Sequence, residues 1–496
     1  MTALRFYNTL TKRKEAFAPL ADGRVGIYVC GITAYDLCHV GHARSAVVFD
    51  VITRYLRYRG FDVVYVKNYT DVDDKIIDRA NREGVDIGEV AGRYIREHDR
   101  DMDALGVERP TVTPRATEHI DGMVKLITTL IEKGLAYVVD GDVYYAVERF
   151  PGYGKLSGRS LDDMMAGARV EVDEKKRNPL DFALWKKSKE GEPWWESPWG
   201  RGRPGWHIEC SVMSQHYLGE TFDIHGGGED LIFPHHENEI AQSEGATGKP
   251  FARYWIHNGF IKVRSEKMSK SLGNVFTIRE ILELHHPETL RLFILQGHYK
   301  SPLDYSEESL SEARAGLGRF YETLKKVNDV MASGVDFSSV SAANLPGKER
   351  ALHEHAIGLP GRFVEAMDDD FNTARALGCL FETVRALNGF IGDKAFKATA
   401  EALFVLDAGK RAVVETGGTL GLFRDDPDAY FVADRNREAR KRGLSVNEVE
   451  RLIAERGRAR EDKDWRRADE IRSELTARGV VLKDGPAGTT WTVEGV

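Results

Sequence analysis

The stretch Tyr28-Val-Cys-Gly-Ile-Thr-Ala-Tyr-Asp-Leu-Cys-His-Val-Gly-His42 decides the fold of the N-terminal part of this chain. Residues 25–29 form a short run of β-branched and aromatic residues, which predicts a buried strand. After the stretch, apolar residues recur three and four positions apart, which predicts a helix that stops at Gly60. A second apolar strand is expected over 61–67, so the segment predicts a β-α-β unit.

The segment His39-Val-Gly-His42 opens the predicted helix, and Cys30 lies at the end of the strand before it. The first backbone N–H groups of a helix lack partners within the helix and lie at the positive end of its dipole, so this position favours a bound phosphate. The natural ligand site of such a unit is the crevice at the strand ends. No Gly-x-Gly-x-x-Gly motif is present, which disfavours a dinucleotide-binding domain.

Length and composition are those of an ordinary protein with several domains. The chain has 496 residues, of which 42% are hydrophobic and 30% charged, and a formal net charge of −8. Charged residues interrupt the N-terminal region, and no run approaches the roughly 20 apolar residues of a membrane span. We therefore expect a cytoplasmic location and no membrane partner. The negative charge argues against a general nucleic-acid coat but allows a local basic surface.

Four cysteines are too few for a disulfide scaffold in a chain of this length. In a reducing compartment they are better considered as ligands or as core residues. Cys38 and Cys379 lie in apolar, helical surroundings, so we expect both in the core.

Between the two informative regions, the pattern predicts an insertion into the sheet domain. The polar stretch 68–75 fits a turn followed by a helix N-cap, and its position alone leaves a functional role open. An amphipathic helix is expected over 116–134, followed by a hairpin around Asp140-Gly141. Residues 153–199 are rich in Gly, Pro, Lys and Trp, so we expect loops with little regular structure there.

A second informative region runs from Trp206 to Glu239. Gly226–Gly228 follow a short strand and allow a ligand to approach the backbone closely, and Pro234 is expected to begin a helix. His235 and Glu239 are four positions apart, so on a helix they project from one face. With two cysteines they could form a tetrahedral zinc site, although the spacing is not that of a zinc finger, and a structural role stays open. The four candidate ligands are Cys30, Cys210, His235 and Glu239.

The segment Lys267-Met-Ser-Lys-Ser271 combines two ammonium groups with two hydroxyls. A solvated charged loop is the simplest interpretation of such a pentapeptide. Its composition also suits transient capture of a polyphosphate, since lysines provide mobile point charges.

After Tyr305 the pattern changes to amphipathic helices, expected over 310–327 and 352–367, with a break in the second at Pro360. The segment Asp425-Asp-Pro-Asp428 is typical of a boundary. Beyond it, residues 435–467 hold twelve Lys or Arg against seven Asp or Glu, a local charge of +5. A charged run of this kind is usually a solvated helix face.

The two phosphate-directed segments together, 39–42 and 267–271, resemble the paired signatures of class I aminoacyl-tRNA synthetases. With the four candidate metal ligands, the chain resembles the cysteinyl-tRNA synthetase family over nearly its whole length, from 8–15 to 484–491. The one departure in the first signature is Val40 in place of the commoner isoleucine.

The resemblance implies an α/β fold: a Rossmann-like catalytic domain with a parallel sheet and an insertion, followed by an α-helical bundle and a small C-terminal domain. The implied domains are the first half of the catalytic domain (1–115), a connective insertion (116–204), the second half (205–265), the KMSKS loop with a stem-contact region (266–308), the helical bundle (309–425) and an anticodon-binding domain (434–496).

The implied activity joins L-cysteine to ATP, which brings Mg²⁺, and transfers the cysteinyl group to the 3′ end of tRNA-Cys. One Zn²⁺ per chain would select the substrate thiolate, because a hydroxyl is harder and far less acidic. The substrate sulfur would enter as a fifth ligand, or Glu239 would loosen to admit it. A monomer is expected.

The resemblance also assigns roles to individual residues. The phosphate-binding and catalytic residues would be His39, Gly41, His42, Lys267, Ser269 and Lys270. The pocket for cysteine would include Gly31, Thr70, Trp206 and Asp230. The anticodon would contact Arg460, Trp465, Asp469 and Asp484.

Two other functions fit parts of the pattern. A ligase that joins cysteine to an amino sugar, as in mycothiol biosynthesis, resembles a synthetase shortened at its C-terminus, whereas this chain keeps the helical and basic regions. A zinc-stabilised RNA-binding protein without catalysis would leave the two phosphate-directed segments without a purpose.

Overall fold

The computed structural model describes residues 3–167, 175–263, 266–267, 275–485 and 488–494. Contacts divide the chain into two compact units. The first unit comprises residues 1–275, 294–305 and 360–379, and the second comprises 276–293, 306–359 and 380–496. None of the helices in the described part of the chain combines the length and apolarity that a membrane span requires.

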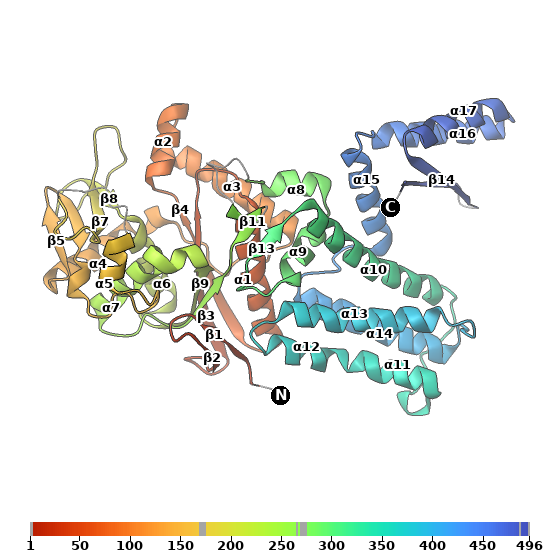
Figure 1. Cartoon of the computed structure of the whole chain (residues 1–496), viewed down its shortest axis with the longest axis horizontal. Helices are drawn as coiled ribbons and strands as arrows, with labels where there is room; N and C mark the ends of the chain where they lie inside the picture. The colour runs from red at the N-terminus through yellow and green to blue at the C-terminus, as the bar shows by residue number, and fades with distance from the viewer. Residues whose placement is uncertain (1–2, 168–174, 264–265, 268–274, 486–487, 495–496) are drawn as a thin grey trace. The chain divides into compact units, whose positions relative to one another are not determined.

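A four-stranded parallel sheet forms the centre of the first unit (Figure 1). The order of its strands is β10-β9-β3-β4. Helix α1 connects β3 to β4, which confirms the predicted β-α-β unit and the predicted α/β fold class. The buried, β-branched side chains of β3 supply the apolar surface on which the helices pack. The bounds are β3 Arg24–Thr33, α1 Val40–Tyr58, β4 Asp62–Thr70, β9 Phe222–Gly228 and β10 Ala252–Asn258.

The insertion carries its own antiparallel sheet, in the order β5-β6-β7-β8. The predicted hairpin is confirmed: β5 and β6 pair across Asp140 and Gly141, whose φ angles of 53° and 89° are those of a tight hairpin turn. The elements are α4 Ile120–Glu132, β5 Ala136–Val139, β6 Asp142–Tyr145, α5 Leu161–Gly167, β7 Phe182–Lys187 and β8 Gly202–Pro204.

The prediction of little regular structure over 153–199 is wrong, because α5 and β7 lie within it. Strand β7 forms because Leu184 and Trp185 are fully buried and its backbone pairs with both β6 and β8. Asp181 fixes its start, since its carboxylate accepts hydrogen bonds from the Val147 N–H and the Tyr137 hydroxyl. The surrounding glycines, prolines and lysines are typical of loops, so the sequence pattern does not indicate this strand.

The remaining elements of the first unit surround the sheet. The regular helix α7 begins at Glu237, three residues after the predicted start at Pro234. Phe233, which precedes the proline, is extended, with φ −140° and ψ 130°, as is usual for a residue before proline, and the chain is kinked there. The elements are β1 Arg5–Asn8, β2 Arg13–Ala16, α2 Asp74–Glu83, α3 Ile87–Leu105, α6 Trp206–Leu218, a π-helical turn Ile232–His236, α7 Glu237–Thr247, β11 Ile261–Val263, β12 Glu266–Lys267, β13 Leu303–Tyr305 and α12 Leu359–Met367.

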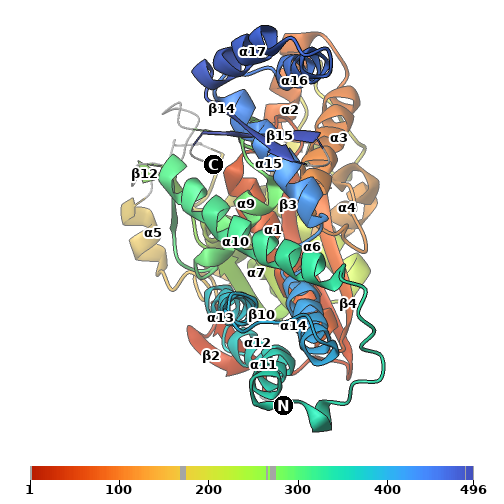
Figure 2. The same ribbon diagram turned by 90° about the vertical axis from the view of Figure 1, so that its right-hand side faces the viewer.

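The second unit is mainly helical, and its helix α14 packs against α10 and α11 (Figure 2). The predicted break near Pro360 is confirmed, since α11 ends at Ile357 and α12 begins at Leu359. Helix α13, Thr373–Ile391, has residues in both units. The other helices are α8 Ile278–Leu284, α9 Pro287–Gln296, α10 Glu307–Met331, α11 Gly347–Ile357, α14 Ala400–Thr419 and α15 Pro427–Lys441.

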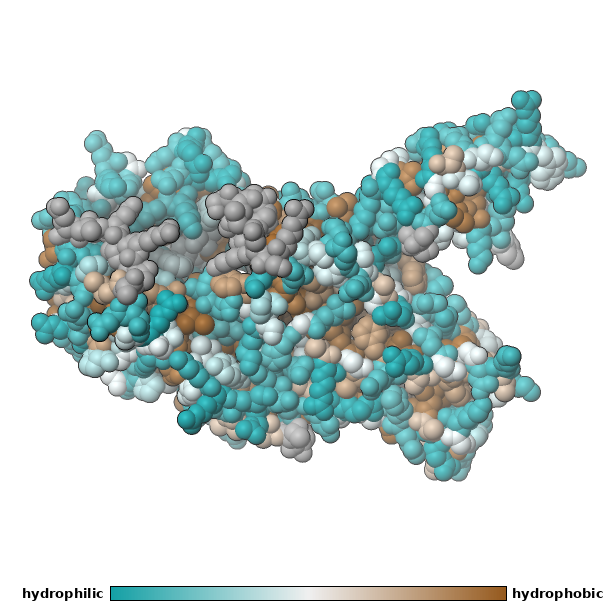
Figure 3. Space-filling model, in the orientation of Figure 1, coloured by the Kyte–Doolittle hydropathy of each residue, from teal (hydrophilic) through white to brown (hydrophobic). Residues whose placement is uncertain are grey.

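The C-terminal segment builds a small core of its own from α16, α17 and the hairpin β14–β15. Leu452, Ile471 and Trp491 are among its buried residues. The surface over α16 and α17 is largely hydrophilic on the face seen in Figure 3, as expected for amphipathic helices. The bounds are α16 Val446–Glu461, α17 Trp465–Ala477, β14 Val480–Gly485 and β15 Gly488–Val493.

The two cysteines expected in the core differ from each other. Cys38 is buried, but it lies in the loop before α1 rather than in a helix. Cys379 lies in α13 and is only half-buried, so the prediction of a core position is wrong for it. The apolar neighbours of Cys379 in sequence occupy other sides of the helix, since successive residues lie about 100° apart around the axis.

Candidate active site and metal centre

Four side chains from four segments converge beside the end of β3. Cys30 belongs to β3, Cys210 to α6, His235 to the π-helical turn and Glu239 to α7. One ligand atom of each lies within 4.8 Å of all the others. The Sγ atoms of Cys30 and Cys210 are 3.7 Å apart, and His235 Nε2 is 3.0 Å from Glu239 Oε1. The structure therefore contains a possible metal site built from the four predicted ligands.

The chemistry of this donor set fits zinc. Two sulfurs bound at about 2.3 Å to one tetrahedral zinc lie roughly 3.8 Å apart, close to the separation of Cys30 and Cys210. Thiolates select soft metals such as zinc, whereas a site for magnesium or calcium would be built from oxygen. Cys210, His235 and Glu239 are at most 2% exposed, so the donors are shielded from water.

The charges at the site prepare two of the four predicted ligands for metal binding. Burial alone would raise the pKa of Cys210, but contacts with Cys30 and His235 outweigh it and lower this pKa to about 6. Burial also acts to raise the pKa of Glu239, and the neighbouring His225 and His235 lower it to about 2. Cys210 and Glu239 are therefore already in the forms that bind a metal. Burial raises the pKa of Cys30, and Glu239 and Cys210 outweigh burial to raise that of His235 to about 10, so metal binding releases protons from these two side chains.

Three buried histidines that the sequence pattern did not predict surround these ligands. His225 Nε2 lies 2.8 Å from Glu239 Oε2, and His236 Nε2 lies 3.3 Å from Cys30 Sγ. His257 in turn lies 2.8 Å from His236. A second possible ligand set consequently overlaps the first and consists of Cys30, His225, His236 and Glu239. The first set contains two thiols and suits zinc better. The dense run 235–239 indicates a site, but the sequence does not tell which of the two adjacent histidines, both of them buried, belongs to the ligand set with two thiols.

A cavity of about 300 Å³ opens next to the metal centre. It lies where β3, β9 and β10 end and where α1 begins, which is the usual ligand position in a parallel sheet. The predicted residues that line it are Cys30, Gly31, His39, Gly41, His42 and Asp230. Lys67, His98 and Asn258 also line it, and the sequence pattern predicted no role for them.

The two histidines of the first signature lie at the start of α1 with their rings stacked, 3.8 Å between centroids. His39 is the N-cap: its Nδ1 accepts a hydrogen bond from the Gly41 N–H, and Nδ1 of His42 accepts one from the His39 N–H. In a neutral imidazole whose Nδ1 accepts, the proton is on Nε2. Both rings therefore present an N–H donor of the kind that a phosphate oxygen accepts.

The four residues predicted for the cysteine pocket have different surroundings. Gly31 lines the cavity and has no room for a side chain, because a Cβ there would lie 1.5 Å from the Asn68 carbonyl oxygen. Trp206 stacks on His235 at 4.2 Å and is 39% exposed. Asp230 lines the cavity. Thr70 is not among the lining residues, and its buried hydroxyl donates to Glu209 Oε2 at 2.6 Å.

The second signature lies largely outside the described residues. The backbone of Lys267 pairs with Lys262 in the β11–β12 ladder. Its side chain, together with the whole of residues 268–271, is outside the described part of the chain. The roles assigned to Lys267, Ser269 and Lys270 stay predictions.

Two of the predicted anticodon contacts pair with each other. Arg460 lies 3.0 Å from Asp484, which also accepts two hydrogen bonds from Arg456, at 2.8 and 2.9 Å. The hydrogen bonds from Arg456 hold the pKa of Asp484 below its usual range. Trp465 begins α17 and is 60% exposed, and Asp469 on the same helix is exposed. Only Trp465 and Asp469 are therefore accessible without breaking an ion pair.

Solved structures share this fold. A methionyl-tRNA synthetase from Mycobacterium tuberculosis bound by methionyl-adenylate superposes with a TM-score of 0.58 at 17% identity, covering 83% of this chain and 96% of that chain. A putative arginyl-tRNA synthetase from Campylobacter jejuni gives a TM-score of 0.56 at 13% identity, covering 81% and 94%. The fold is that of the class I aminoacyl-tRNA synthetases.

Sequence comparison narrows the class. The model of the class I (C) tRNA synthetase catalytic domain matches residues 16–315, that of the DALR domain 362–424, and that of the cysteinyl-tRNA ligase anticodon binding domain 437–491. Relatives named Cysteine--tRNA ligase include one from Trichlorobacter lovleyi, 58% identical, and one from Geobacter sulfurreducens, 56% identical; each match covers 99% of this chain and 100% of the relative. The chain belongs to the cysteinyl-tRNA synthetase family.

Proposed function

We propose that this chain activates L-cysteine with ATP and transfers it to the 3′ end of tRNA-Cys, selecting cysteine through zinc. The main observation behind this proposal is that the ligand atoms of Cys30, Cys210, His235 and Glu239 lie within 4.8 Å of one another. The cavity next to them is lined by His39 and His42. The match to an anticodon-binding domain over 437–491 disfavours the shortened ligase for amino sugars and the RNA-binding protein without catalysis.

Zinc bound by these four residues would coordinate the substrate thiolate and so distinguish cysteine from serine. A pocket without a metal would distinguish them poorly, because the two side chains are similar in size. The protein residues do the rest. His39 and His42 would donate to the phosphates of ATP and hold them against the start of α1. Asp230 would accept from the α-ammonium group, and Trp206 would pack over the sulfur. Lys267 and Lys270 would neutralise the charge that develops on the departing pyrophosphate. Mg²⁺ would enter with ATP.

The chemistry requires no protein nucleophile, because the substrate carboxylate itself attacks the α-phosphate and pyrophosphate leaves. In the second step a hydroxyl of the terminal ribose attacks the carbonyl carbon and AMP leaves. The protein thus acts by positioning and by charge stabilisation. The mass, 55.7 kDa, is what light scattering should give for the expected monomer.

The test uses cysteine-dependent ATP–pyrophosphate exchange and the metal content of purified protein. We expect about one zinc per chain in the wild type and in a Cys379→Ser control. Cys210→Ser should lose most of its zinc and its exchange activity together, because a hydroxyl replaces a thiolate ligand. Activation of serine within about tenfold of cysteine by the zinc-loaded wild type would contradict selection by the metal.

A further inference from the structure

Lys67 is a positively charged residue at the cavity that the function proposed above does not use. It belongs to β4 and is one of the residues that line the cavity. Within the described part of the chain its ammonium takes part in no hydrogen bond or ion pair. Burial lowers its pKa by more than the nearby Cys38 raises it, so the charged form is partly desolvated at this position. A charge kept in such a place without a partner points to an anionic ligand.

The alternation of β4 places Lys67 on a particular side of the sheet. Neighbouring residues of a strand point to opposite faces. The side chain of Asn68 accepts from the Gly31 N–H at 2.8 Å and lies 3.7 Å from Cys210 Sγ, so it points to the side of the metal centre. Lys67 therefore points to the other side, as does Tyr69, which contacts His98 on α3.

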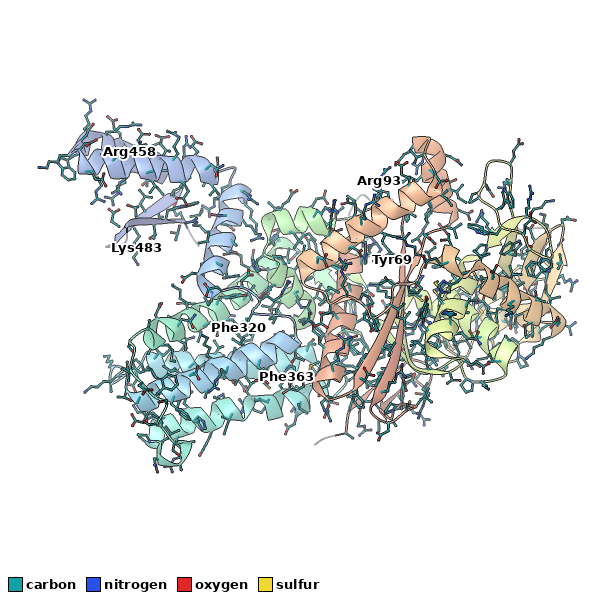
Figure 4. The ribbon with its side chains drawn as sticks, turned by 180° about the vertical axis from the view of Figure 1, so that it is seen from behind. Tyr69, Arg93, Phe320, Phe363, Arg458 and Lys483 are labelled. Atoms are coloured by element: carbon teal, nitrogen blue, oxygen red, sulfur yellow. The ribbon has the colours of Figure 1, made fainter. Side chains whose placement is uncertain are left out.

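His98 lines the same cavity as Lys67 and is fixed by a chain of polar contacts. Its Nδ1 lies 3.0 Å from the hydroxyl of Tyr69, which donates to Asp99 at 2.6 Å. Arg109 in turn lies 2.7 Å from Asp99. Figure 4 labels Tyr69, at the end of β4. Burial, with a smaller contribution from Lys67, lowers the pKa of His98 by more than Asp99 raises it, so His98 is a neutral neighbour that leaves the lysine charge available to a ligand.

The reaction offers two anions, the carboxylate of the amino acid and the phosphates of ATP. The sulfur of the amino acid belongs to the side of Asn68 and Cys210. Lys67 lies on the opposite side of the strand, on the face of the sheet that carries α3, and it shares the cavity with the stacked rings of His39 and His42. The phosphates are the anion that such a position reaches.

We propose that Lys67 is a further phosphate-binding residue of the ATP site, held beside His98. This inference rests on the proposed function in taking ATP as the substrate. A charge-assisted hydrogen bond to a phosphate strengthens binding without contributing to recognition of adenosine, and this difference can be measured.

The test compares binding of ATP and of adenosine to the full-length, zinc-loaded protein by equilibrium dialysis. The variants are Lys67→Met, Lys67→Arg and, as a control, Lys125→Met, which removes an exposed lysine on α4. Lys67→Met should raise the Kd for ATP roughly tenfold to a hundredfold and leave the Kd for adenosine within about twofold. Lys67→Arg should restore most of the affinity, and zinc content and melting temperature should not change.

Other results of this binding comparison would overturn the inference. Equal weakening of ATP and adenosine would make Lys67 a structural residue, and unchanged ATP binding would remove it from the site; both overturn the inference. If the wild type bound ATP but did not activate cysteine, the proposed function would fail while the binding comparison still judged Lys67. In an active enzyme, Lys67→Met should raise the KM for ATP and leave the KM for cysteine unchanged.

Discussion

His225 Nε2 lies 2.8 Å from Glu239 Oε2, and neither side chain reaches solvent. The contact occupies one carboxylate oxygen and leaves Oε1 facing Cys30, at 3.3 Å, and His235, at 3.0 Å. The ring of His225 is itself held by stacking on Trp255, 4.5 Å between centroids. Partners of this kind orient a metal ligand and raise metal affinity, although they do not touch the ion.

His225→Phe should therefore lower zinc affinity about 10-fold to 100-fold, because Glu239 loses its orienting partner while the ring volume is kept. Competition with a chromogenic chelator measures the affinity directly. His216→Phe, which changes an exposed histidine on α6, is the control and should hold zinc like the wild type. Unchanged affinity in His225→Phe would show that Glu239 needs no such support.

Gly31→Ala should destabilise the protein by more than 3 kcal/mol or prevent folding, since a Cβ would lie 1.5 Å from the Asn68 carbonyl oxygen and the backbone would have to move. Gly378→Ala is the matched change in the same unit. That glycine lies in α13 with open space around it, so alanine should stabilise the protein by about 0.5–1 kcal/mol. Urea unfolding of both variants gives the comparison, and a stable, active Gly31→Ala enzyme would contradict the close packing of β3 on β4.

Trp465→Ala should leave the melting temperature and cysteine-dependent exchange unchanged, because the side chain is 60% exposed. If Trp465 stacks on an anticodon base, loss of the ring should raise the KM for tRNA about tenfold or more. Aminoacylation at varied tRNA concentration measures this change. An unaltered KM would remove Trp465 from the predicted anticodon contacts.

Asp484→Asn should behave differently, because Asp484 holds Arg456 and Arg460 together. We expect a loss of about 1 kcal/mol in the C-terminal segment at pH 7, a modest value because the carboxylate is partly exposed. The folded pKa of Asp484 lies below the ordinary value near 4. Its stabilisation is therefore complete above about pH 4 and disappears as the pH falls toward the folded pKa. Thermal melts of wild type and variant should converge on acidification, and a difference that grew instead would reverse the assigned sign.

Truncation should separate activation from tRNA charging, provided that α15 is kept. A chain ending at Arg442 should retain cysteine-dependent exchange and lose most charging. A chain ending at Asp428 also loses Tyr430, which stacks on Tyr321 at 3.9 Å, and Asp434, which pairs with Arg314 at 2.8 Å. It should melt at a lower temperature than the longer truncation. Equal loss of exchange and charging in the longer truncation would refute this division.

The sequence predicted those helices, strands and turns that are determined by residues close to one another in the chain. The β-α-β unit and the Asp140-Gly141 hairpin follow from apolar spacing and from a turn that needs positive φ angles. Strand β7 was not predicted because the contacts that stabilise it, pairing with β6 and β8 and the hydrogen bonds that Asp181 accepts from Val147 and Tyr137, join segments that are distant in the sequence. The apolar residues around the buried Trp185 do not form an alternating pattern long enough to indicate a strand.

The site shows the same limit. The residue types of Cys30, Cys210, His235 and Glu239 suggested a zinc site with a structural role left open, and the family resemblance then supported it. The structure brings their ligand atoms together. The contact of His225 with Glu239 depends on how β9 faces α7, and the pair of Arg456 with Asp484 joins a helix to a hairpin. Such contacts are set by packing between distant segments, and a single sequence carries no sign of them.

The alternation along β4 links two properties that are otherwise independent. Asn68 supports the metal side and Lys67 the opposite side, and they are adjacent in the chain. Inserting or deleting one residue earlier in the strand would exchange their directions at the same moment. A substitution can change one side of the strand alone. A change of length in this strand would instead disturb both sides at once, and with them both the selection of the amino acid and the binding of the nucleotide.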